Sequence, residues 1–238
     1  MLEADIARAH RQFPGPDYME ILAWLHRFLR PRSYLEIGVE CGRTLQLAEP
    51  GTRVVGVDPD PLLEPWLRER VQIHSVTSDV FFANHDPVGL LDGRVDLAFI
   101  DGLHLFEQAL RDFINIEKIS GPDTLIVIHD CLPLDARTSS RKRSSCFWSG
   151  DVWRIVPCLR KERPDLKLAT VPAYPAGLCL VRNLDPRQSK LESDFESVVS
   201  RYLAMAYQDI QDKEKAFALI ANQWSAIRAF IDDCGSRQ

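Results

Sequence analysis

One stretch of the chain, residues 33–44 with the sequence SYLEIGVECGRT, limits the possible fold more than any other. Its first half is a short apolar run typical of a buried strand, and two glycines, Gly38 and Gly42, follow directly. Glycine lets the backbone turn sharply and pass close to a ligand. An apolar segment at 44–48 predicts the start of a helix, whose first N–H groups would face that ligand.

A second apolar run, 54–57, ends in Asp58, about 20 residues beyond the first glycine. An acidic residue at this distance holds the ribose hydroxyls of a nucleotide in βαβ folds. The dinucleotide pattern G-x-G-x-x-G requires a glycine two residues after Gly38, but this chain has Glu40 there. Because its carboxylate would repel a pyrophosphate, the stretch argues against NAD or FAD.

The remaining pattern, Glu36-x-Gly38-x-x-x-Gly42-x-Thr44 with Asp58 downstream, resembles the class I S-adenosylmethionine-dependent methyltransferases. The cofactor of that family carries an amino-acid end and a sulfonium but no phosphate, so an acidic loop is tolerated. The resemblance implies that the methionine part lies in a pocket shaped by Glu36, Gly38, Gly42 and Thr44. Asp58 would hold the ribose. The alternative is a tight strand–helix turn of a kind found in any α/β protein.

Length and composition are those of one soluble globular domain, expected to span residues 1–238. The chain is 45% apolar and 26% charged, with a net charge of -5, so we expect neither a nucleic-acid nor a membrane partner. The N-terminus lacks the order of a signal peptide, and no apolar run approaches the length of a membrane span. Six scattered cysteines without a C-x-x-C pair favour reduced thiols in a cytoplasm, and they argue against a zinc site or disulfide framework.

Strand and helix patterns alternate along the chain. The predicted strands lie at 34–37, 54–57, 71–76, 95–100, the second part of 121–130, 166–172 and 177–182. Helices are predicted around 66–70, at 106–119 and from 147 to about 161. Because only four residues, 173–176, join the last two strands, these form a hairpin and one of them runs antiparallel.

This alternation predicts an α/β protein with a Rossmann-like, doubly wound sheet. The sheet should be mostly parallel and finished by the C-terminal antiparallel hairpin, which again resembles the seven-stranded methyltransferase fold. Helices over 1–31, broken at 13–16, and a helical tail over 184–238 would flank a cofactor-binding core at 33–183. The tail could pack on its own sheet or on a second subunit, so a homo-oligomer stays open.

Polar side chains follow five of the predicted strands, at 36–44, 58, 78–79, 101–104 and 129–130. Ligands of parallel sheets bind beyond the carboxyl ends of the strands, so these residues are expected to meet in one active site. There Ser78 and Asp79 could reach the adenine ring, with Asp79 accepting from its exocyclic amine. The alternative for Asp79 is the N-cap of a following helix.

His104 is the best candidate for a general base, because a histidine titrates near neutral pH and this one follows the strand at 95–100. The alternative is a histidine that faces solvent at the start of a helix. Either way, S-adenosylmethionine would bring the electrophile. A small hydroxylated metabolite would be the methyl acceptor.

The stretch from Asp101 to His104, with His129-Asp130 further on, resembles small O-methyltransferases that act on sugars, macrolides and catechols. That resemblance implies a magnesium ion held by Asp101 and Asp130, with His104 as the base. His129 stands where that group has its first ligand after the fifth strand, although imidazole suits softer metals than magnesium. Either His129 is no ligand, or the ion is not magnesium, or no metal binds.

A polar, basic segment at 133–147 predicts a mobile loop. It is either a solvated connector or a lid that meets an anionic substrate group through Arg137, Arg141, Lys142 or Arg143. Two further functions stay open for the whole chain: a non-catalytic nucleoside-binding domain and a nucleotide-dependent oxidoreductase. Glu40 in the glycine loop speaks against the second of these.

Overall fold

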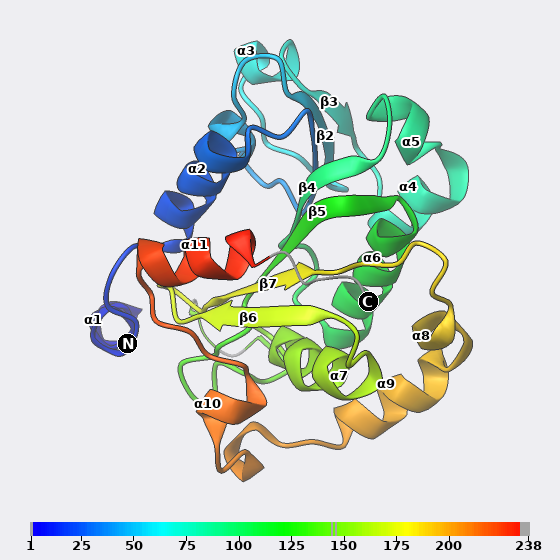
Figure 1. The fold of residues 1–238 in the computed structure, drawn as a ribbon. Helices are drawn as coiled ribbons and strands as arrows, with labels where there is room; N and C mark the ends of the chain where they lie inside the picture. Colours follow the sequence, from blue (N-terminus) through cyan, green and yellow to red (C-terminus); the bar gives the residue numbers. More distant parts are fainter. Residues whose placement is uncertain (1, 144, 146, 234–238) are drawn as a thin grey trace.

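The computed structural model describes residues 2–143, 145 and 147–233. Seven strands form one sheet in the order β3-β2-β1-β4-β5-β7-β6 (Figure 1). They are β1 (Ser33–Ile37), β2 (Arg53–Val57), β3 (Gln72–His74), β4 (Val95–Ile100), β5 (Ser120–His129), β6 (Lys167–Val171) and β7 (Leu178–Arg182). β7 runs antiparallel to both of its neighbours, and the other four pairings are parallel. The predicted sheet, with its C-terminal hairpin, is confirmed.

Helices cover both faces of the sheet, which explains why its central strands are continuous apolar runs. On one face lie α6 (Phe106–Lys118), α7 (Ile155–Glu162) and α9 (Phe195–Leu203), with Phe113 and Leu159 fully buried against the strands. On the other face lie α2 (Tyr18–Leu29) and α11 (Trp224–Asp232). Because Ile227 of α11 is buried beside α2, the C-terminal tail folds back onto its own sheet.

The connection between β1 and β2 is shorter than predicted. The helix expected to begin at 44–48 is wrong: the chain forms one 3₁₀ turn, η1 (Leu45–Leu47), before β2 begins at Arg53. Pro50 and Gly51 leave no room for another helical turn. The expected helix N-terminus is therefore missing here, and two backbone N–H groups of this loop, those of Val39 and Glu40, donate to Asp58 instead.

The remaining helices are mostly short. They are α1 (Leu2–Gln12), α3 (Pro65–Arg68), α4 (Ser78–Asn84), α5 (Pro87–Leu90), η2 (Val152–Arg154), α8 (Lys190–Ser193), η3 (Tyr207–Asp209) and α10 (Lys213–Ala216). The helix predicted from Phe147 begins only with η2, because Gly150 has a positive φ of 65° that interrupts the helical path. None of the described helices has the length and apolarity required to cross a bilayer.

The basic segment predicted to be mobile is anchored to α1. Arg137 donates two hydrogen bonds of 2.7 Å to the buried carboxylate of Asp5, and Arg8 pairs with Asp135. These ion pairs hold the first helix against the segment that follows β5. Four free thiols are described, at Cys41, Cys131, Cys158 and Cys179; Cys146 and Cys234, which the sequence prediction also included, lie outside the described residues.

Candidate active site

A cavity of about 930 Å³ opens at the carboxyl ends of the parallel strands. Most of the predicted site residues line it together: Gly38, Thr44, Asp58, Ser78, Asp79, Asp101, His104, His129 and Asp130. They follow five different strands. Glu36 and Gly42 are not among the lining residues, so their predicted contact with the cofactor is at most indirect.

Glu36 lies beneath the cavity floor and is fully buried. Its carboxyl accepts a hydrogen bond of 2.6 Å from the Tyr34 hydroxyl and a second one from the Thr44 hydroxyl. Burial raises the pKa of Glu36 to about 8, so the side chain is neutral at pH 7. Glu36 therefore acts on the cavity through Thr44, whose hydroxyl it orients.

Gly38 brings the loop after β1 into contact with the loop after β4. Its φ is +86°, and an added Cβ would lie 2.1 Å from the carbonyl oxygen of Asp101. Gly42 also has a positive φ, +72°, but its missing Cβ makes room for Leu63 and Leu67 rather than for a ligand. The first glycine therefore sets the floor of the cavity, and the second one packs the protein.

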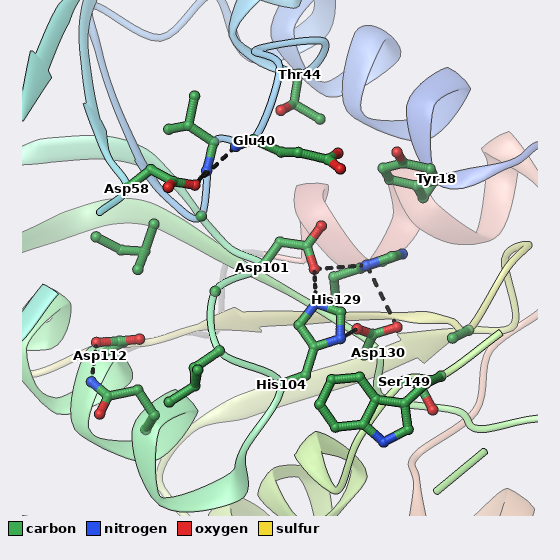
Figure 2. A pocket seen from close by; sticks show the side chains of 18 of the residues that line it. Tyr18, Glu40, Thr44, Asp58, Asp101, His104, Asp112, His129, Asp130 and Ser149 are labelled. Carbon is green, nitrogen blue, oxygen red and sulfur yellow. Dashed lines mark hydrogen bonds and ion pairs between the residues drawn. The ribbon is translucent and has the colours of Figure 1, made fainter. Parts of the chain in front are cut away.

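Asp58 holds the glycine loop from the end of β2 (Figure 2). Its Oδ2 accepts hydrogen bonds from the N–H groups of Val39, at 2.8 Å, and Glu40, at 2.9 Å. Its Oδ1 accepts from the N–H group of Asp60, also at 2.8 Å. A carboxylate offers about four acceptor positions, so one remains for a hydroxyl in the cavity.

A polar group at the start of α4 forms another wall. Thr77, not Asp79, is the N-cap, because its side chain accepts from the N–H group of Val80. The amide nitrogen of Gln108 donates to Ser78 Oγ at 3.0 Å and to Asp79 Oδ1 at 3.1 Å. These contacts fix both side chains at the edge of the cavity.

Two lining residues of this wall escaped sequence reasoning, Gln108 and Asp112 of α6. Asp112 is 1% exposed and accepts from Gln108 at 3.1 Å; burial raises its pKa to about 6. One sequence signal could have identified these two residues. They are polar and four positions apart in an amphipathic helix, so both lie on the same side of that helix.

Four ionisable side chains meet at the ends of β4 and β5 (Figure 2). Nδ1 of His129 lies 3.0 Å from Oδ1 of Asp101 and 3.7 Å from Oδ1 of Asp130. Nε2 of His104 lies 3.4 Å from Oδ1 of Asp101, and its Nδ1 lies 2.8 Å from Oδ2 of Asp130. The structure thus brings the predicted base and the predicted metal ligands into one contact network.

The backbone presents His104 and Asp130 in an unusual conformation. Both have a positive φ, 59° and 61°, which is uncommon outside glycine and tends to mark functional sites. The N–H group of Asp151 donates to the carbonyl of His104 at 3.2 Å, and Gly150 packs so closely that a Cβ would lie 1.9 Å from the same oxygen. The segment after the basic loop therefore holds the candidate base in place.

Electrostatic interactions couple these four side chains. Burial alone would lower the pKa of His104, but the carboxylates of Asp130 and Asp101 raise it to about 11. The pKa of His129 is raised by the same two carboxylates against the effect of its burial. Burial would raise the pKa of Asp101, but the two imidazoles hold it well below its usual range. These contacts therefore favour the protonated form of His104 at neutral pH.

The donor set also fits a divalent cation. Asp101, His104 and Asp130 each offer a ligand atom within 4.8 Å of the others. Nε2 of His129 is buried without a hydrogen-bond partner among the described residues, and Nδ1 of His104 and Oδ2 of Asp130 contact only each other there. Two carboxylates beside imidazole suit a transition metal better than magnesium. The three residues within this distance include His104 in place of the predicted His129.

Of the four basic residues considered for a lid, only Arg143 lines the cavity. Arg137 is paired with Asp5, and Arg141 donates to both Glu107 and the buried Asp151. The side of the cavity beyond His104 is otherwise largely aromatic and apolar, lined by Ile6, Tyr18, Phe147, Trp148, Tyr174, Pro175 and Ala176.

The sheet order, the C-terminal hairpin and a cavity at the strand ends are those of the class I S-adenosylmethionine-dependent methyltransferase fold. Residues 35–131, from β1 to just beyond β5, match a family described as "Methyltransferase domain". The chain matches no curated protein sequence.

Solved structures share this fold at low sequence identity. The O-methyltransferase TomG from Streptomyces achromogenes, in complex with SAM, is 20% identical with a TM-score of 0.50, over 76% of this chain and 89% of TomG. Cofactor-bound Rv0187 from MTB is 18% identical with a TM-score of 0.54, over 77% of this chain and 90% of that protein. At these identities the similarity shows the fold alone.

Proposed function

We propose that this protein binds S-adenosylmethionine and transfers its methyl group to a hydroxyl oxygen of a small metabolite. The observation that carries the proposal is the convergence of His104 and two carboxylates with the glycine loop in one cavity. The methionine part would lie against Gly38 and Thr44. The solved neighbour TomG, an O-methyltransferase in complex with SAM, supports this choice of donor.

Hydrogen-bond acceptors for the nucleoside part of the cofactor lie on the opposite wall of the cavity. The remaining acceptor position of Asp58 suits a ribose hydroxyl, and Asp79 beside Ser78 suits the exocyclic amine of adenine. Gln108 and Asp112 would support these two side chains from α6. The loop offers no glycine at Glu40, and a diphosphate would meet that carboxylate.

Methyl transfer requires a general base and an aligned acceptor more than it requires covalent catalysis by the protein. The acceptor oxygen attacks the methyl carbon, the C–O bond forms as the C–S bond breaks, and the hydroxyl proton passes to His104. His104 can accept that proton only in its neutral form, whereas Asp101 and Asp130 favour the protonated form. Whatever reduces the negative charge of these two carboxylates therefore activates the base.

We further propose that a divalent cation binds at Asp101 and Asp130, with an imidazole completing the donor set. A bound cation would lower the pKa of a hydroxyl that contacts it. The buried Nε2 of His129, Nδ1 of His104 and Oδ2 of Asp130 support this assignment, because none of them has a hydrogen-bond partner outside this cluster. Since His104 cannot be ligand and base at the same time, His129, which contacts both carboxylates, is the better nitrogen ligand during turnover.

The test is transfer of a labelled methyl group from S-adenosylmethionine into a panel of hydroxylated metabolites, with and without added Mn²⁺, and identification of the product as an O-methyl ether. Formation of an ether by the wild type but not by His104→Asn supports the proposal. Binding of the cofactor without transfer to any hydroxyl would instead favour a non-catalytic nucleoside-binding domain.

A further inference from the structure

Four aromatic side chains form a wall along one side of the cavity. Tyr18, Phe147, Trp148 and Tyr174 line it, and each is half-buried. The backbone of Tyr18 donates to that of Tyr174, and the Tyr174 ring lies 6.4 Å from the ring of Phe147. These contacts bring together segments that lie far apart in the sequence.

This wall reaches the reacting groups. The ring centroids of Tyr18 and His129 are 4.6 Å apart, and those of Trp148 and His104 are 5.4 Å apart with nearly parallel planes. Tyr18 is labelled beside His129 in Figure 2. An acceptor whose hydroxyl reaches His104 must therefore lie against aromatic surface.

Two polar groups at the wall are committed to the protein. The indole nitrogen of Trp148 donates to the carbonyl of Ser140 at 2.5 Å, and the hydroxyl of Ser149 donates to the carbonyl of Thr138 at 3.0 Å. The hydroxyls of Tyr18 and Tyr174 make no hydrogen bond among the described residues and could pair with one or two polar groups of an acceptor. A polyhydroxylated sugar has more hydroxyls than that and would leave some without partners, at a cost for each. A flat aromatic ring would instead fill the space with apolar contact.

One cation faces this side of the cavity. The guanidinium of Arg143 lies 5.9 Å from the Trp148 ring centroid, and no carboxylate of the described residues pairs with it. The other arginine of the lining, Arg43, follows Gly42 in the glycine loop and belongs to the cofactor side. Arg143 is therefore available to an anionic group of the acceptor.

We propose that the acceptor is a hydroxylated aromatic acid, whose ring lies on the aromatic wall and whose carboxylate pairs with Arg143. This inference rests on the proposed methyltransferase function and narrows its substrate class. His104 then reaches the ring hydroxyl, and Arg143 holds the opposite end of the molecule.

The experiment compares methyl transfer to the three monohydroxybenzoates, to their matching neutral amides and to gluconate, a non-aromatic acid, with transfer and binding measured separately. For at least one acid, kcat/KM should exceed that of its amide by at least about tenfold, the effect of a charge-assisted hydrogen bond. Arg143→Gln should remove this difference, mainly through KM. Lys142→Gln, an exposed neighbour outside the cavity, should keep it.

Three outcomes would overturn the proposal: an amide that matches its acid, gluconate as the better acceptor, or no binding of any benzoate to the complex with S-adenosylhomocysteine. In each case, intact binding of S-adenosylhomocysteine would leave the methyltransferase proposal standing. Loss of that binding would remove the proposed function itself.

Discussion

Nδ1 of His104 lies 2.8 Å from Oδ2 of Asp130, yet neither atom makes a directional hydrogen bond with any described residue. The contact joins the loop after β4 to the end of β5, and both residues adopt a positive φ to make it. A proton on His104 makes this contact a buried ion pair, and without that proton two lone pairs would face each other at a cost in free energy. We therefore regard this pair as the reactive centre of the cavity.

Replacing the candidate base should abolish transfer but not cofactor binding. His104→Asn should lower kcat by about 10²–10⁴-fold, the usual contribution of general base catalysis. Its affinity for S-adenosylhomocysteine, measured by calorimetry, should stay within a few fold of the wild type. The matched control is His85→Gln, a histidine exposed on the surface, which should leave both quantities unchanged. Full activity of His104→Asn would exclude the base role.

Removing one carboxylate should change both the imidazole and the cation site. In Asp130→Asn the pKa of His104 should fall from about 11 towards its ordinary value, because the carboxylate that contributes most to raising it is gone. NMR titration of the ring protons checks this. The same variant should bind Mn²⁺ at least about tenfold more weakly than the wild type. If Mn²⁺ binds neither protein measurably, the cation part of the proposal is wrong.

The buried carboxyl under the glycine loop should make stability depend on pH. Because burial raises the pKa of Glu36 from 4.5 to about 8, the folded protein keeps a proton that the unfolded chain has already lost in that range. The free energy of unfolding should therefore fall as pH rises through this window, by at most about 1.4 kcal/mol per pH unit from this group. Below pH 4.5 the whole contribution of Glu36 to the free energy of unfolding is present.

Glu36→Gln should flatten that dependence, since glutamine stays neutral and still meets Tyr34 and Thr44. Urea unfolding of both proteins at several pH values between 4.5 and 8 provides the comparison. Parallel pH profiles for the two proteins would mean that Glu36 is ionised in the folded state.

Substitutions at two glycines distinguish the cost of backbone strain from the cost of a close backbone contact. Gly38→Ala and Gly51→Ala both place a Cβ at a positive φ, but only at Gly38 does it meet a backbone, 2.1 Å from the oxygen of Asp101. Each should lose about 1–2 kcal/mol of stability from strain. Gly38→Ala should lose more, together with affinity for S-adenosylhomocysteine. Equal effects of the two substitutions would show that the contact does not matter.

The sequence predicted those parts of the site that follow strands. Asp101, His104 and Asp130 could be placed because apolar runs identify β4 and β5, and parallel strands bring their ends together. Gln108 and Asp112 could not, since their position in an amphipathic helix is equally compatible with a solvent-facing side. Only the packing of α6 beside α4 turns them towards the cavity.

Two further differences between the predicted and the observed structure come from the length of a connection and from contacts between residues distant in the sequence. The five apolar residues at 44–48 look locally like a helix start, but the short path to β2 permits only one 3₁₀ turn. The basic segment has few apolar anchors of its own, and its order comes from Asp5 and Glu107, which are distant in sequence. The periodicity of apolar residues indicates local structural preference, and it does not reveal contacts with residues that are distant in the sequence.

The most direct test of the central claim is calorimetric titration of the purified protein with S-adenosylhomocysteine and, separately, with NADH. The loop that carries Glu40 and lacks a second glycine predicts saturable binding of the adenosyl compound and no measurable heat with the dinucleotide. Tight binding of NADH together with no heat from S-adenosylhomocysteine would contradict the assignment of this cavity.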